Sequence, residues 1–236
     1  MNALKTLLAV AFAISVAIPT FAQETTSSTP APGAKVSNTG QVAVPAQPSA
    51  GQPSAGQPNP AEMMKQMTEM AKTNENHKLL SSLDGNWNYT IRFWMNPDPN
   101  AKPQESKGTA IRKSIMDGRY VVMDVNGKMQ MPDANGKMKD INFKGMGMEG
   151  YDNVKKKFVA SWIDNMGTGI EFSEGTYDPA SKSFTYTSEM EPMPGMKTSV
   201  REVIKIADKD HMSLEWFENQ GGQEKKTMEI AYTRKK

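Results

Sequence analysis

The chain contains no cysteine, and this absence excludes several classes of function. It has no disulfide, no thiol nucleophile, no thiolate zinc site and no redox pair. An excess of one charge is also missing, since 28 basic residues face 26 acidic ones and no basic block occurs. A nearly neutral chain of this kind argues against nucleic acid or an anionic membrane as its main partner.

Leucine is scarce. Only four leucines follow residue 22, whereas all but one of the nineteen methionines do. The sequence therefore predicts a core of methionine, valine, isoleucine and aromatic residues. Without disulfides, this core must be large enough to hold the fold by burial alone.

The first 22 residues have the pattern of a signal peptide. Lys5 supplies positive charge, residues 6–17 form an apolar run, and residues 20–22 (TFA) provide a small-residue cleavage site. The run is too short for a spanning helix, and Pro19 interrupts it. We therefore expect an exported protein, periplasmic or secreted, with no transmembrane segment.

Residues 23–60 have the composition of a linker. They contain seven prolines and no aromatic residue, and residues 47–58 read QPSAGQPSAGQP. Such a segment cannot bury enough apolar surface to offset its ordering entropy, so we expect disorder. Residues 61–236 are expected to form one domain.

Two short helices are predicted at the start of this domain. Asn59 and Pro60 are typical of a helix start, and methionines recur at helical spacing from Met63 to Met70. Asn74 can cap a second helix that contains His77. We expect these helices to plug one end of the domain.

From Gly85 onward the apolar period changes to two. Residues 87–93 alternate apolar and polar side chains, and similar segments recur to the end of the chain, separated by turn signals. The connections are too short for crossover helices, so the sheet should be antiparallel. An all-β, calycin-like, up-and-down barrel of about ten strands is favoured, because closure removes exposed edges.

Gly85 and Trp87 form a Gly-x-Trp motif directly after a short helix, which resembles the entry of the calycin superfamily (lipocalins, fatty-acid-binding proteins and relatives). In calycins a basic residue of the last strand packs over this tryptophan, and Arg234 is the matching residue. The resemblance implies structural roles for Gly85, Trp87 and Arg234. The longer glycine pattern of the haem-binding nitrobindins is missing, since residues 88–92 contain no glycine.

Residues 75–236 resemble more closely a bacterial secreted family known as domain of unknown function 1579. The matching segments include HKLL at 77–80, GRY at 118–120, GYDN at 150–153 and WID at 162–164. This resemblance implies the barrel fold and brings no established activity.

Three acidic residues share strand faces with apolar residues and are therefore expected to point inward: Asp164, Glu174 and Glu202. Unpaired buried carboxylates are costly, so they need partners. The arginines available are Arg112, Arg119, Arg201 and Arg234. They form a paired network, the polar floor of a ligand cavity, or a catalytic pair. The sequence leans away from an enzyme, because nothing fixes the separation of the carboxylates.

We expect non-catalytic binding of a small, partly apolar molecule inside the barrel. Aromatic residues would form the wall, and charged residues would orient the ligand. The candidate ligand-binding residues are Trp87, Tyr89, Trp162, Asp164, Glu174, Tyr186, Arg201, Glu202 and Trp216.

Copper binding is an alternative. Met190, Met193 and Met196 are spaced Met-x-x-Met-x-x-Met in a predicted loop, and thioethers suit Cu(I). The two histidines, His77 and His211, do not form a cluster for zinc. On this hypothesis the cofactor is copper, and otherwise no cofactor is expected.

Overall fold

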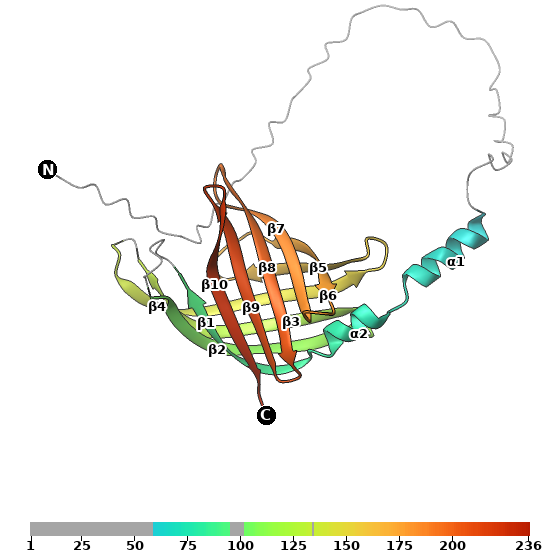
Figure 1. The fold of residues 1–236 in the computed structure, drawn as a ribbon, viewed down its shortest axis with the longest axis horizontal. Coiled ribbons are helices and arrows are strands. Elements are labelled where there is room, and N and C mark those ends of the chain that lie inside the picture. Colours follow the sequence, from blue (N-terminus) through green and yellow to red (C-terminus); the bar gives the residue numbers. More distant parts are fainter. Residues whose placement is uncertain (1–58, 95–101, 134) are drawn as a thin grey trace, which may run out of the picture. The chain divides into compact units, whose positions relative to one another are not determined.

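The structure describes ten strands and two helices. It is a computed structural model that describes residues 59–94, 102–133 and 135–236 (Figure 1). The predicted signal peptide (residues 1–22) and the predicted linker up to residue 58 lie outside these residues. The elements are α1 (Pro60–Met70), α2 (Glu75–Ser81), β1 (Gly85–Phe93), β2 (Gln104–Ile115), β3 (Tyr120–Pro132), β4 (Met138–Asp152), β5 (Lys157–Asp164), β6 (Glu171–Asp178), β7 (Ser183–Met193), β8 (Met196–Asp208), β9 (His211–Gln220) and β10 (Gln223–Arg234).

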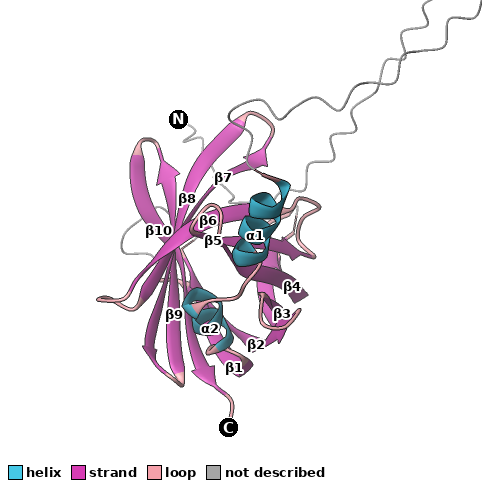
Figure 2. Ribbon diagram, turned by 90° about the vertical axis from the view of Figure 1, so that its right-hand side faces the viewer, coloured by secondary structure: helices cyan, strands magenta, loops and turns pink. Residues whose placement is uncertain are grey.

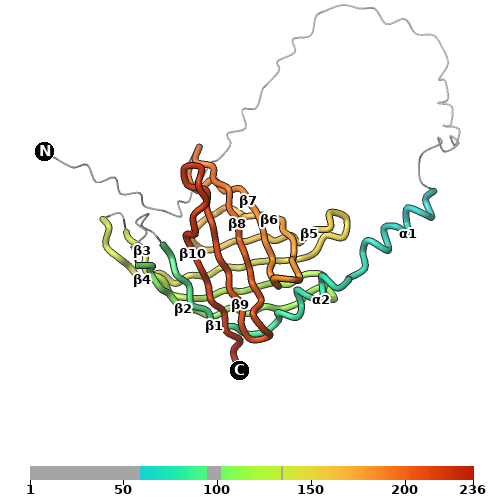
Figure 3. Tube along the Cα trace, viewed as in Figure 1, coloured from blue at the N-terminus to red at the C-terminus, as the bar shows by residue number. Residues whose placement is uncertain are grey.

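The strands form one closed antiparallel barrel with up-and-down order (Figure 3). Each strand pairs with the next in sequence, and β1 pairs with β10 to complete the ring, with Trp87 opposite Arg234. Closure satisfies the backbone groups that edge strands expose. The prediction of an all-β barrel with about ten strands is confirmed. No helix in the described residues is long and apolar enough to span a bilayer.

The second helix, α2, begins at a well-formed cap. The Asn74 side chain accepts a hydrogen bond from the backbone N–H of Asn76 at 2.9 Å, and the Asn74 N–H donates to His77 Nδ1 at 3.1 Å. Burial lowers the pKa of His77, in agreement with a neutral ring that accepts at this nitrogen. The His77 ring meets Tyr151 of β4 edge-on at 5.8 Å between centroids. The cap and this contact fix α2 against the barrel (Figure 2).

The half of the barrel interior next to α2 is filled by side chains. Phe184 meets Phe158 at 4.9 Å and Tyr177 at 4.7 Å between ring centroids. Leu80 of α2 and Leu83 of the following turn are buried in the same cluster. Because edge-to-face and tilted rings fill space efficiently, this end of the barrel has a solid core.

Trp87 connects the first strand, the last strand and the turn after α2. Its ring is fully buried, and its Nε1–H donates to the Leu83 carbonyl at 3.1 Å. The Arg234 guanidinium carbon lies 4.2 Å from the ring centroid, and Arg234 also donates to the Asp84 carbonyl. Gly85 has a φ of 140°, and a Cβ at this position would overlap the guanidinium. The motif therefore requires glycine.

The predicted core is confirmed in its valine, isoleucine and aromatic residues and is wrong in its methionines. Leu80, Leu83 and Leu214 are buried, whereas Met212 is the one methionine of the described residues in the buried core. On β4, Met146 and Met148 are exposed. The physical reason is the pleat, because these methionines alternate with glycines that occupy the inner face of the strand.

Candidate functional site

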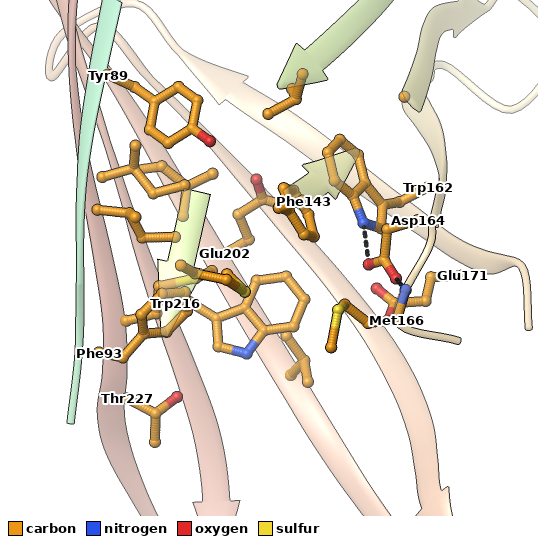
Figure 4. A pocket seen from close by; sticks show the side chains of 18 of the residues that line it. Tyr89, Phe93, Phe143, Trp162, Asp164, Met166, Glu171, Glu202, Trp216 and Thr227 are labelled. Atoms are coloured by element: carbon orange, nitrogen blue, oxygen red, sulfur yellow. Dashed lines mark hydrogen bonds between the residues drawn. The ribbon is translucent and has the colours of Figure 1, made fainter. Parts of the chain in front are cut away.

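The other half of the barrel interior contains a cavity of about 250 Å³. Its wall comes from all ten strands and is mostly apolar. Figure 4 shows the aromatic and acidic side chains that point into it. The aromatic lining residues include Tyr89, Phe93, Phe143, Trp162, Tyr186 and Trp216. A space of this size accepts a small organic molecule.

Trp162 lies flat against β4 because that strand leaves room for it. A Cβ at Gly145 would overlap the Trp162 ring, so the close approach depends on glycine. The ring stacks on Phe143 with 6.4 Å between centroids and 18° between planes. Its Nε1–H donates to Asp164 Oδ2 at 2.9 Å. Trp162 is thus held in one orientation at the cavity wall.

Asp164 terminates β5 and organises the turn that follows. Its Oδ1 accepts hydrogen bonds from the backbone N–H groups of Met166 at 2.8 Å and Gly167 at 3.2 Å. Glu171 lies beside it at the start of β6 (Figure 4). Burial, together with the charge of Asp164, raises the pKa of Glu171 to about 7. The two carboxyls form an acidic pair at one side of the cavity.

Glu149 lines the floor of the cavity, and its ion-pair partner is Arg112. Arg112 Nη1 and Nη2 donate to the two carboxylate oxygens of Glu149 at 2.9 and 2.8 Å. The side chains are 3% and 13% exposed, so this is a buried bidentate ion pair. The guanidinium charge is therefore already balanced by one carboxylate.

Glu202 enters the cavity from β8, near Trp216 (Figure 4). Burial, and then the charges of Glu149 and Glu171, raise the pKa of Glu202 to about 8. At neutral pH this carboxyl is mainly protonated and can both donate and accept a hydrogen bond.

Tyr186 stands opposite Glu202 in the β7–β8 register. Its side chain is almost completely buried, and its hydroxyl has no hydrogen-bond partner among the described residues. Burial, with contributions from Glu149 and Glu202, keeps its pKa well above the usual value. A buried hydroxyl without a partner costs about 1–3 kcal/mol, which a bound molecule can recover.

Six of the predicted ligand-binding residues meet at this cavity. They are Tyr89, Trp162, Asp164, Tyr186, Glu202 and Trp216. Trp87 lies in the packed half and does not line the cavity, because it is occupied by its contacts with Arg234 and Leu83.

The predicted inward orientation of Glu174 is wrong. Glu174 lies on the outer face, where Lys155 and Lys157 donate to it at 2.6 and 2.8 Å and lower its pKa to about 2. The prediction followed its apolar neighbours Ile170 and Phe172, which are 59% and 70% exposed. Alternation identifies two faces of a strand but not which one is interior, and here the outer face carries the larger apolar residues.

Arg201 also points away from the cavity. It donates to both carboxylate oxygens of Glu224 and lies 4.0 Å from the centroid of the Phe217 ring on the outer surface. Its neighbour Glu202 points inward, as the pleat requires of consecutive residues. The assignment of Arg201 to ligand orientation is therefore wrong.

The sequence analysis missed Glu149, Glu171 and Phe143, and it named Arg112 only as an available partner for inward carboxylates. Arg112 alternates with Ala110, and Glu149 alternates with Gly147, so neither strand face has an obvious apolar pattern. Glu171 alternates with Ser173 in the same way. Small residues on an inner strand face are the signal that was available, because they make room for large groups across the barrel.

The methionine triplet belongs to a hairpin rather than the predicted loop. Met190 and Met193 end β7, Met196 begins β8, and Met193 pairs with Met196 in the ladder. Both members of this pair are exposed. No group of three His, Asp or Glu residues in the described chain is placed to hold a metal ion.

Comparison with known proteins identifies a family and no activity. The family model described as "Protein of unknown function (DUF1579)" matches residues 72–234, which include α2 and all ten strands. No curated protein matches the chain.

Proposed function

The chain belongs to the DUF1579 family of proteins of unknown function, and on the basis of its barrel we propose that it binds a small, partly apolar molecule without transforming it. The observation that carries the proposal is the cavity of about 250 Å³ in a barrel whose other half is solidly packed. Interiors are normally close-packed, so an aromatic cavity of this size is a feature that needs an occupant.

The residues that line the cavity could both bury a ligand and select it by its hydrogen-bonding groups. Trp162, Phe143 and Trp216 supply apolar and π surface, and the neighbouring residues Glu202 and Tyr186 supply hydrogen-bonding groups. Trp162 is already fixed by Gly145, Phe143 and Asp164, so little side-chain entropy is lost when a ligand binds.

Native mass spectrometry of the protein, purified from an exporting host without denaturation, is the first test. An extra mass of a few hundred daltons supports the proposal and identifies the ligand class. Fluorescence titrations with the neutral probe N-phenylnaphthylamine then test whether the aromatic wall contributes to binding. Trp162→Ala should weaken probe binding about tenfold or more, because an aromatic contact is lost.

Phe172→Ala is the matched control, since this residue is aromatic, lies on the adjacent strand and is 70% exposed on the outer face. It should leave probe binding unchanged. A bare mass together with probe binding that survives Trp162→Ala would contradict the proposal.

We also propose that the protein is exported. The support is the pattern of residues 1–22, which lie outside the described residues. A mature chain that begins at Gln23, measured by intact mass in the periplasm or medium, is the expected result. An uncleaved chain in the cytoplasm would count against export.

Cu(I) binding is the second candidate. It is favoured by the ladder pairing of Met193 with Met196, which places two exposed thioethers on one face of a hairpin. Anaerobic titration should show a Cu(I) site that Met193→Ser abolishes and that Met146→Ser, an exposed methionine of β4, leaves intact. An unchanged titration in Met193→Ser excludes the site.

A further inference from the structure

The cavity contains carboxyl groups for which the protein supplies no counterion. Among the described residues, no lysine or arginine forms an ion pair with Asp164, Glu171 or Glu202. Among the described arginines only Arg112 is buried, and Glu149 accepts two hydrogen bonds from its guanidinium. The interior therefore carries a surplus of acidic groups next to apolar and aromatic walls.

An unpartnered group independently indicates a ligand at this place. The hydroxyl of Tyr186, 2% exposed, has no hydrogen-bond partner among the described residues, and Glu202 stands opposite Tyr186 in the β7–β8 ladder. Its oxygen can accept a hydrogen bond from a molecule between it and the carboxyls. An N–H donor satisfies this hydroxyl and the carboxyls at the same time.

The wall around this region also favours a cation. Trp162 and Phe143 stack at one side of the cavity and Trp216 lies at the other, so π faces border the acidic region (Figure 4). The negative face of an aromatic ring attracts an organic cation, and the attraction grows when water is excluded. An anionic ligand, by contrast, would meet repulsion from these carboxyls, because Lys128, the one basic residue among the described lining residues, is exposed to solvent.

We propose, building on the proposed cavity function, that the ligand is a small organic amine whose ammonium group lies between Glu171 and Glu202, within reach of the Tyr186 hydroxyl, with its apolar body against Trp216 and Phe143. A bare metal ion is a poorer fit, because no three His, Asp or Glu side chains of the described residues converge on one point. A molecule with several N–H donors can bridge carboxyls that are apart.

Such binding is coupled to proton release. The pKa values of Glu171 and Glu202 are raised to about 7 and about 8, so both carboxyls are partly protonated near neutral pH. The groups that face them are Asp164, Glu149, Arg112, Tyr186 and Tyr232. An ammonium ion favours the ionised carboxyls, so its arrival expels protons and its affinity rises between about pH 6 and 8.

Three nearly isosteric probes test the charge preference. Calorimetric titration of the purified protein with phenethylamine, phenethyl alcohol and phenylacetate compares a cation, a neutral molecule and an anion. We expect the amine to bind about tenfold more tightly than the alcohol, and phenylacetate to bind most weakly. Titration of the amine in buffers with different ionisation enthalpies should reveal proton release.

Glu171→Gln and Glu202→Gln keep the shape of the side chains and remove the charge. Each should reduce the preference for amine over alcohol about fivefold to tenfold while alcohol affinity stays the same. Glu174→Gln is the matched control on the outer face and should change neither affinity. Thermal unfolding of each variant verifies that the fold is retained.

The outcomes separate the two proposals. Alcohol binding that equals amine binding, or an amine preference that survives both glutamine substitutions, overturns the ammonium inference and leaves a neutral-ligand cavity. Absence of binding by all three probes and by N-phenylnaphthylamine, together with a bare native mass, overturns the cavity function itself.

Discussion

Arg112 of β2 forms a bidentate ion pair with Glu149 of β4 across the intervening strand β3. Arg112 pairs with Met123 in the ladder, and Glu149 pairs with Val121 of the same strand. The two hydrogen bonds of 2.9 and 2.8 Å therefore span β3 on the inner face of the barrel. The ion pair therefore ties three neighbouring strands together at the cavity wall.

Glu149→Gln should destabilise the fold by about 3–5 kcal/mol, because it leaves a buried guanidinium without its counterion. Urea unfolding measures the loss. The double substitution Arg112→Met/Glu149→Leu should recover most of it, since neither charge then remains buried. A double variant that is no more stable than Glu149→Gln would assign the loss to packing instead.

Glu202 should make stability fall as pH rises. Its pKa is about 8 in the fold against 4.5 for a free side chain, so the folded state retains a proton that the unfolded state releases. Stability contributed by this proton is present below pH 4.5 and is lost progressively up to about pH 8. At about 1.4 kcal/mol per pKa unit, the loss is on the order of a few kcal/mol.

Glu202→Gln should therefore flatten the fall of unfolding free energy between pH 5 and 9, as measured by chemical denaturation. Glu174 provides a control of opposite sign. Its pKa is about 2 because Lys155 and Lys157 bond to it, so its contribution is present above pH 4.5 and disappears as pH falls toward 2. Glu174→Gln should leave the alkaline limb unchanged. An identical alkaline limb in Glu202→Gln would argue against a raised pKa.

Gly145→Ala should displace the Trp162 ring, because the added Cβ overlaps it. We expect weaker N-phenylnaphthylamine binding and a loss of about 1–3 kcal/mol in stability. Gly169→Ala is the matched control, since nothing lies within 4 Å of the corresponding Cβ. The idea fails if the two alanine variants bind the probe equally.

Arg234→Leu should destabilise the barrel by about 1–3 kcal/mol, because it removes the contact with Trp87 and the hydrogen bonds to the carbonyls of Asp84 and Lys209. Thermal unfolding followed by circular dichroism measures the loss of stability. Arg201→Leu, on the outer face, should cost much less. Equal losses would show that Arg234 has no special role.

The barrel could be predicted because strand period and short turns are local properties. The run from Trp87 to Phe93 shows its inner face directly, and the same pattern recurs in most strands. In β6, alternating hydrophobicity fails to identify the inner face. Its apolar Phe172 is outside and its acidic Glu171 is inside, so hydrophobicity pointed to the wrong face.

The cavity floor could not be predicted because it depends on contacts between distant strands. Nothing local to Arg112 or Glu149 indicates that they meet across β3. The same holds for the unpaired state of Tyr186, which is a property of what surrounds it in three dimensions. The sequence identified six of the wall residues, whereas the arrangement of charged groups around the cavity could be seen only in the folded structure.

The solid core beside α2 has a kinetic consequence. Phe158, Phe184 and Leu80 pack the barrel at that end, so a ligand in the proposed cavity would enter and leave at the opposite rim. Because the ligand would leave by the path along which it entered, association and dissociation would cross the same barrier at the rim. Substitutions at the rim should then change both rates together and leave the equilibrium constant nearly untouched.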